Sequence, residues 1–195
     1  MDFEPLRNRA SIAEELLGHL RGRSRLSSDV PLVWATYDTT FTGCYRVEIA
    51  VGRHCRLAIE HVGGDGAFDW SIAEDERRRP GSAGRAVDGP VQPPTADEVR
   101  YRAEEVEADA VAGRDLIRSL QALDWGEATP EDRRGRDGVV MSGGLVTDAG
   151  VRWWTTWSPE PAREPAKAAF FGIVLRFAVE QATGDLADDL ARVSM

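Results

Sequence analysis

The chain has 195 residues, of which 42% are hydrophobic and 29% are charged, and its formal net charge is −9. Length and composition predict one soluble globular domain spanning residues 1–195 with one substantial core. The acidic balance argues against nucleic-acid binding, which needs clustered Lys and Arg, and against anionic membranes. A protein partner with a basic surface is an easier inference than either, but solubility is the favoured reason for the acidity.

The cysteines and the most apolar segment bear on the cellular compartment. Cys44 and Cys55 are too few for a disulfide framework, and no basic start followed by an apolar stretch marks a secretory signal. The most apolar segment, 168–179, carries Arg176 and is shorter than the roughly 20 residues that a membrane-spanning helix needs. We therefore predict a buried helix there and a cytoplasmic protein.

The first half of the chain changes its hydrophobic period. Apolar spacings of three and four predict an amphipathic helix over residues 5–21. A spacing of two, with Gly and Asp between the runs, then predicts an antiparallel meander of four strands at 31–37, 44–51, 55–62 and 67–73. The segment 74–94 has no period and is rich in charge, Gly and Pro, so we expect a flexible loop.

The register of the second and third strands follows from side-chain alternation. Directly opposed residues share a face, so the apolar sets align when Val51 opposes Cys55 around a loop at 52–54. This register also places Arg46 opposite Glu60, a cross-strand pair of opposite charge. Continued into the next predicted hairpin, it brings three pairs together: Ile59 with Trp70, Leu57 with Ile72, and His61 with Phe68.

The second half reads as a helix, a hairpin and two further helices. Thr95 and Glu98 form a capping box, and apolar steps from Val99 to Leu120 predict one long helix after it. A hairpin of strands 139–146 and 151–157 follows. A helix ending near residue 182 and a short helix led by Asp185 complete the chain.

This order predicts an α+β fold, in which an antiparallel sheet (four-stranded meander plus C-terminal hairpin) packs on helices in the order α-ββββ-α-ββ-α-α. In element order alone, the arrangement is similar to small acidic secretion-chaperone folds. The similarity implies a partner-binding protein that forms dimers.

Half of the six tryptophans lie in the run 151–159, as Trp153, Trp154 and Trp157. If the run is a strand, alternation puts Trp153 and Trp157 on one face and Trp154 on the other. A three-residue turn in the hairpin sets Gly144 opposite Trp154. Because the apolar helix that follows needs cover, at least one of the two faces belongs to the core, and the other is left for a partner.

Histidine is the first place to look for acid-base or metal chemistry. His61 lies beside Tyr45 on the apolar face of the predicted sheet and is either a general base or a hydrogen-bonded core residue. His54, Cys55 and His61 have a loose metal-like spacing, but alternation sends His54 and Cys55 to opposite faces. We expect a core histidine and no metal or other cofactor.

Arg176 is the one charged residue in the most apolar helix. It either extends its guanidinium to water or pairs with a buried acid, and both structural interpretations are favoured over a role in binding a ligand carboxylate.

Two hypotheses of function follow. The first is a noncatalytic acidic protein-binding module, chaperone-like or immunity-like, that uses Trp153 and Trp157 as anchors and can form a homodimer, since Trp is enriched at interface hot spots. The alternative is a small-molecule-binding protein or small enzyme with a pocket between sheet and helices. That pocket would be lined by Trp34, Trp70, Tyr45 and His61, with Arg176 as an anion anchor.

Overall fold

The protein has an α+β fold built on one six-stranded antiparallel sheet, as the sequence predicts. The computed structural model describes residues 32–39, 43–64, 67, 70, 74, 92–95, 97–125 and 139–193. The predicted helix at 5–21 and most of the predicted loop at 74–94 lie outside these residues. The strands are β1 (Leu32–Thr39), β2 (Gly43–Val51), β3 (Cys55–Gly63), β4 (Arg100–Ala108), β5 (Val139–Thr147) and β6 (Gly150–Trp157).

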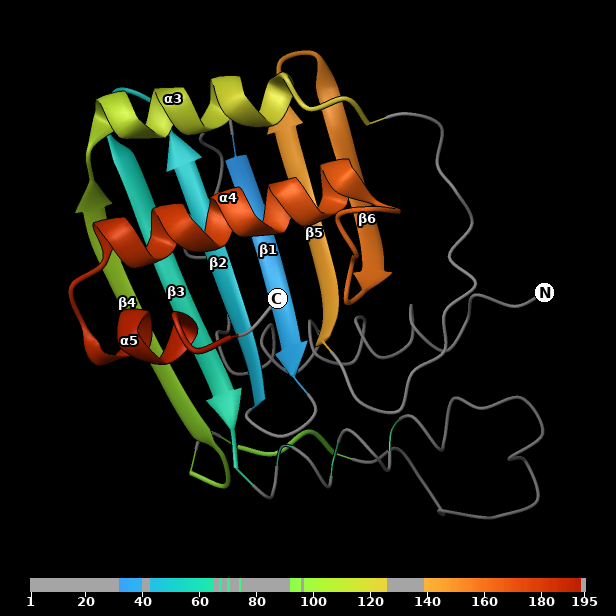
Figure 1. Ribbon diagram of the computed structural model, residues 1–195. Coiled ribbons are helices and arrows are strands. Elements are labelled where there is room, and N and C mark those ends of the chain that lie inside the picture. Colours follow the sequence, from blue (N-terminus) through green and yellow to red (C-terminus); the bar gives the residue numbers. More distant parts are fainter. Residues whose placement is uncertain are drawn as a thin grey trace.

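The strands follow the order β4-β3-β2-β1-β5-β6 across the sheet, so β4 and β6 form its two edges. Three helices cover one face, which we call the helix face (Figure 1). They are α3 (Ala110–Gln121), α4 (Pro165–Gln181) and α5 (Asp185–Leu190). We call the other side of the sheet the opposite face.

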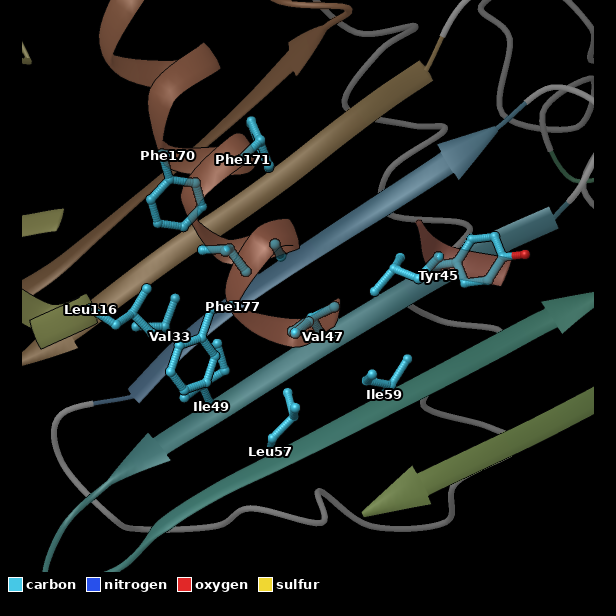
Figure 2. Packing of buried hydrophobic residues seen from close by; sticks show 14 of the residues in the cluster. Val33, Tyr45, Val47, Ile49, Leu57, Ile59, Leu116, Phe170, Phe171 and Phe177 are labelled. Atoms are coloured by element: carbon cyan, nitrogen blue, oxygen red, sulfur yellow. The ribbon is translucent and has the colours of Figure 1, made fainter. Parts of the chain in front are cut away.

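The main core lies between the helix face and the three helices. Figure 2 shows Phe170, Phe171 and Phe177 of α4 over aliphatic side chains of the central strands, such as Val47 and Ile49. All of these residues are buried. The period-two pattern of β1, β2 and β3 produces this core because every second side chain of a strand points to the same face.

The register of β2 and β3 confirms the alternation argument. Val51 pairs with Cys55 across the loop at 52–54, and Arg46 pairs with Glu60. The prediction succeeds because a slip of one residue would turn every apolar side chain of one strand to the wrong face.

The predicted strand at 67–73 is wrong. Its described residues Ala67 and Trp70 are helical, as is Glu74 directly after it. Ala67 and Trp70 pack in a second cluster with Cys44 and Val62, which the strand alternation places on the opposite face. Trp70 therefore does not lie beside Ile59, and Phe68 and Ile72 of the other two predicted pairs lie outside the described residues. Spacings of three and four fit residues 67, 70 and 74, but the period of two and the Gly and Asp residues between the runs predicted a strand.

The fourth strand of the meander is instead β4, within the segment predicted as one long helix. Thr95 and Glu98 do interact, because the Thr95 amide and hydroxyl both donate to the Glu98 carboxylate at 2.8 Å, which lowers the Glu98 pKa. The motif closes a turn before β4 and does not cap a helix. The helix begins only at α3, where the Asp109 carboxylate accepts from the Ala112 amide at 2.7 Å.

Pairing with β3 explains why the helical pattern of β4 is overridden. Nine residue pairs join the strands, and Val106 and Ala108 face the core. The first half of the predicted helix has small and charged residues, so it offers little apolar area to bury as a helix, whereas the ladder satisfies its backbone groups.

Cys55 leads to a prediction about alkaline stability. Its thiol is buried under α3, so close to Gly113 that a Cβ there would lie 2.6 Å from Sγ. Burial, with the negative charge of Asp109, raises the Cys55 pKa to about 11. Because the unfolded thiol ionises at lower pH, this group's stabilisation is complete below about pH 8.5 and falls as the pH rises toward 11.

We expect the free energy of unfolding to fall less steeply above pH 9 in a Cys55→Ala variant than in the wild type. Urea unfolding at several pH values measures both slopes, and the comparison removes contributions from other groups that titrate there. Equal slopes would contradict the assignment.

Candidate functional site

The tryptophan hairpin has a register one residue different from the predicted one. Thr147 pairs with Gly150, so the turn has two residues and not three. Trp153 therefore lies opposite Gly144, and Trp154 lies opposite Gly143. The predicted pairing of Gly144 with Trp154 is wrong, because Gly150, which has a φ of +129°, belongs to the strand pair and not to the loop. The predicted separation of Trp153 and Trp154 onto different faces is confirmed.

Trp154 belongs to the core. Its ring meets Phe170 edge-on, with centroids 4.5 Å apart, and Trp125 with centroids 4.2 Å apart. Gly143 makes room for this cluster, since a Cβ there would lie 2.6 Å from the Phe170 ring. Within the described residues the indole nitrogens of Trp125 and Trp154 have no hydrogen-bond acceptor. Ring packing therefore holds Trp154 in place.

The opposite side of β6 carries exposed apolar side chains. Trp153 is 60% exposed and Val151 is 68% exposed, and alternation places both on the opposite face. Trp157, on the same face, is half-buried. In the described part of the chain the only other exposed large hydrophobic residue is Val111, on α3. Two such neighbours on an edge strand form the most prominent apolar feature of the described surface.

The backbone of β6 is also open on one side. The Ser158 amide donates to the Val139 carbonyl at 2.8 Å. Hydrogen-bonded pairs alternate in an antiparallel ladder, so every second residue before Ser158 bonds to β5. Three of the intervening residues direct their N–H and C=O groups away from β5, toward an edge where the described residues supply no strand: Val151, Trp153 and Thr155.

Tyr45 and His61 lie together on the helix face, near α5. Their ring centroids are 4.3 Å apart, and His61 is only 5% exposed. Arg102 approaches His61 Nδ1 at 3.4 Å and donates to the Asp189 carboxylate at 2.5 Å. The Arg102 hydrogen bond lowers the Asp189 pKa, and burial raises the Tyr45 pKa. This arrangement ties α5 to β3 and β4.

A catalytic role for His61 would need access to a substrate. Its ring is packed against Tyr45, whose hydroxyl points away from the main core in Figure 2. Its Nδ1 lies 3.4 Å from the Arg102 guanidinium, a group that can only donate hydrogen bonds. These contacts describe a core histidine that positions a helix.

The other proposed pocket residues do not join Tyr45 and His61. Trp34 lies over Gly144 on the opposite face, where a Cβ on that glycine would approach the indole to 2.5 Å. Trp70 is also on the opposite face, in the second cluster. Arg176 is exposed on α4. The sheet thus separates the four aromatic residues that the pocket hypothesis placed together.

A polar cluster on the opposite face was not predicted. Arg46 donates to the Glu48 carboxylate at 2.7 Å and lies over the Trp34 ring, 5.4 Å from its centroid. Tyr101 donates to the Glu60 carboxylate at 2.6 Å. Both carboxylates are almost fully buried, with 3% and 2% exposure. The sequence predicted only that Arg46 and Glu60 are opposed across β2 and β3. It did not predict that the opposite face is buried there, because that burial depends on distant segments.

A wide hollow of about 680 Å³ lies beside the loop between β2 and β3. His54 in its wall pairs with Glu107 at 2.8 Å, and both side chains are mostly exposed. The lining mixes arginines with carboxylates: Arg53, Arg56, Glu105 and Glu107. Charges of both signs at an exposed surface describe a solvated face and specify no ligand.

Comparison with known proteins gives no information on function, so the proposals below rest on the geometry. No family model, curated protein or solved structure matches the chain. Among the described residues no three His, Cys, Asp or Glu side chains are grouped as metal ligands, and none of the described helices is long and apolar enough to cross a membrane.

Proposed function

We propose that this chain is a noncatalytic protein-binding module, of the chaperone-like or immunity-like kind, that recognises its partner through the edge strand β6. The observation that carries the proposal is the exposure of Trp153 and Val151, at 60% and 68%, on a strand at the edge of the sheet that the described residues form. Large apolar side chains rimmed by polar surface are typical of binding sites, and Trp is enriched among the residues that dominate interface energies.

Trp153 and Trp154 have different parts in this proposal. Trp154, packed on Trp125 and Phe170, fixes the position of β6 from the helix side. Trp153 projects from the same strand to the opposite face and is free to be buried by a partner. A rigid backbone below an exposed ring lowers the entropy lost on binding, so the core tryptophan supports the surface one.

The competing hypothesis of a small enzyme has less support. It depended on a cavity reached by His61, whose ring is packed and 5% exposed. The buried carboxylates of Glu48 and Glu60 contact Arg46 and Tyr101 on the other side of the sheet, so they are not placed to act with His61.

The test compares capture of proteins from a lysate of the native host by the immobilised wild-type chain and by a Trp153→Ser variant. We expect the variant to lose specific partners, because a hot-spot tryptophan contributes about 2 kcal/mol or more to binding. A Val111→Ser variant is the matched control, since it removes an exposed apolar side chain from α3. Equal capture by all three proteins would contradict the use of β6.

A further inference from the structure

We propose that the partner recognised by β6 is a second copy of this chain, and that the two β6 strands pair antiparallel to form one continuous sheet across a two-fold axis. This inference rests on the proposed protein-binding role of β6. It goes further by naming the partner and the mode, which is strand addition through backbone hydrogen bonds.

The two edges of the sheet differ in a way that favours strand addition at one of them. In β4, five of nine residues are charged: Arg100, Arg102, Glu104, Glu105 and Glu107. Charged residues on an edge strand oppose pairing with another chain. In β6 the only charged residue is Arg152, and the strand is otherwise Gly, Val, Thr and Trp. One edge is therefore protected against pairing, and the other is suited to it.

The backbone of β6 is compatible with its own copy. Val151, Trp153 and Thr155 turn their N–H and C=O groups outward, so an added strand must place its own outward residues opposite them. A two-fold axis at Trp153 meets this condition. It sets Trp153 opposite Trp153 of the second copy and Val151 opposite Thr155.

The side chains also agree with this register. The two Trp153 rings meet as a cross-strand aromatic pair on the opposite face, a favourable pairing in antiparallel sheets. Arg152 falls opposite Trp154 of the second copy and not opposite its equivalent, so the one charge of the strand does not meet a like charge. Both exposed apolar residues of β6 become covered.

Charge distinguishes a second copy from a basic partner. The edge itself carries no carboxylate between Gly150 and Trp157, so the acidity of the chain is not concentrated where the partner would dock. Two chains of net charge −9 repel at long range. Salt screens this repulsion, so self-association should strengthen as ionic strength rises, whereas binding of a basic protein should weaken.

The test measures the mass of the full chain by light scattering over a micromolar concentration series, at low and at high salt. We expect the mass to rise from 21.4 kDa toward twice that value, with a lower dissociation constant in high salt. Hydrogen exchange supplies a second readout, because strand pairing slows exchange of the Trp153 and Thr155 amides whereas contact through side chains alone does not.

Two variants should weaken the proposed strand pairing, each by a different physical cause. Thr155→Pro removes one outward N–H without touching the bonds to β5, and Trp153→Lys places a charge at the centre of the edge. We expect each to weaken the dimer at least about tenfold. Val111→Lys is the matched control and should leave dissociation unchanged. Circular dichroism checks that each variant is folded.

The outcomes separate this inference from the proposed function. A wild-type chain that stays monomeric at every concentration, or a dimer indifferent to both β6 variants, overturns the self-pairing. If a monomer still captures another protein in a Trp153-dependent manner, the protein-binding role stands and its partner is heterologous. If it captures none, both proposals fail.

Discussion

Replacing Phe170 with Ala should lower the free energy of unfolding by about 3–5 kcal/mol. Phe170 is fully buried, and its ring meets Trp154 and Phe171 edge-on, with centroids 4.5 and 5.2 Å apart. The strand beneath it carries Gly143, which has no side chain to move into the vacated space. The surrounding rings are large and mutually fixed, so the cavity should persist and the loss should lie toward the upper end of this range.

Equilibrium unfolding in urea measures this loss as a lower midpoint with an unchanged slope. Arg176→Met on the same helix is the control, and because Arg176 is exposed we expect it to change stability by no more than about 0.5 kcal/mol. A loss below about 2 kcal/mol for Phe170→Ala would mean that α4 collapses toward β5.

The elements that could be predicted from sequence are those in which one local pattern has one solution. Strands β2 and β3 alternate strictly, and their loop length leaves one register that keeps all apolar side chains on the same face. The helix α4 is apolar and begins at Pro165. Both needed no information from distant segments.

The described residues Ala67 and Trp70 of the predicted strand are helical and 100–108 of the predicted helix is a strand, because the local patterns of both stretches were weak. Residues of β4 have small side chains and charges at helical spacing, yet nine pairs with β3 decide their conformation. Trp70 offered bulk suited to a strand, but it packs from a helix against Cys44 and Val62. In each case tertiary contacts outweighed an intrinsic preference of about 1 kcal/mol or less per residue.

The candidate site was predicted in part. Alternation alone separates Trp153 from Trp154. Which of them is buried depends on the segment after α3 and on α4, since Trp154 is covered by Trp125 and Phe170, which are distant in sequence. A Glu that alternates with apolar residues on a strand normally indicates a side chain in water. Glu48 and Glu60 are buried instead, and this burial depends on packing that the local sequence does not indicate.

Replacing Arg46 with Met should destabilise the protein by about 3–5 kcal/mol, because it removes the cation from the buried carboxylate of Glu48. Arg46 donates to the Glu48 carboxylate at 2.7 Å, and Glu48 is only 3% exposed. A charge that loses its partner inside a protein keeps its desolvation cost without the compensating attraction. Met preserves much of the contact that the Arg46 stem makes with Trp34.

A matched control separates the effect of the Glu48 carboxylate from that of the cation–π contact. Arg152 lies over the Trp125 ring at 5.3 Å, nearly the distance between Arg46 and Trp34, but it is exposed. Arg152→Met removes a comparable cation–π contact and should cost only about 0.5–1 kcal/mol. If Arg46→Met costs no more than Arg152→Met, the buried carboxylate of Glu48 does not depend on Arg46.

A double variant tests the physical cause. Arg46→Met combined with Glu48→Leu replaces both members of the ion pair by apolar groups, so no charge of that pair is left behind. Such replacements are often neutral or stabilising, whereas removal of one partner is costly. We therefore expect urea unfolding to show that the double variant is more stable than Arg46→Met alone. A double variant less stable than the single one would instead make packing by the Glu48 side chain the main contribution.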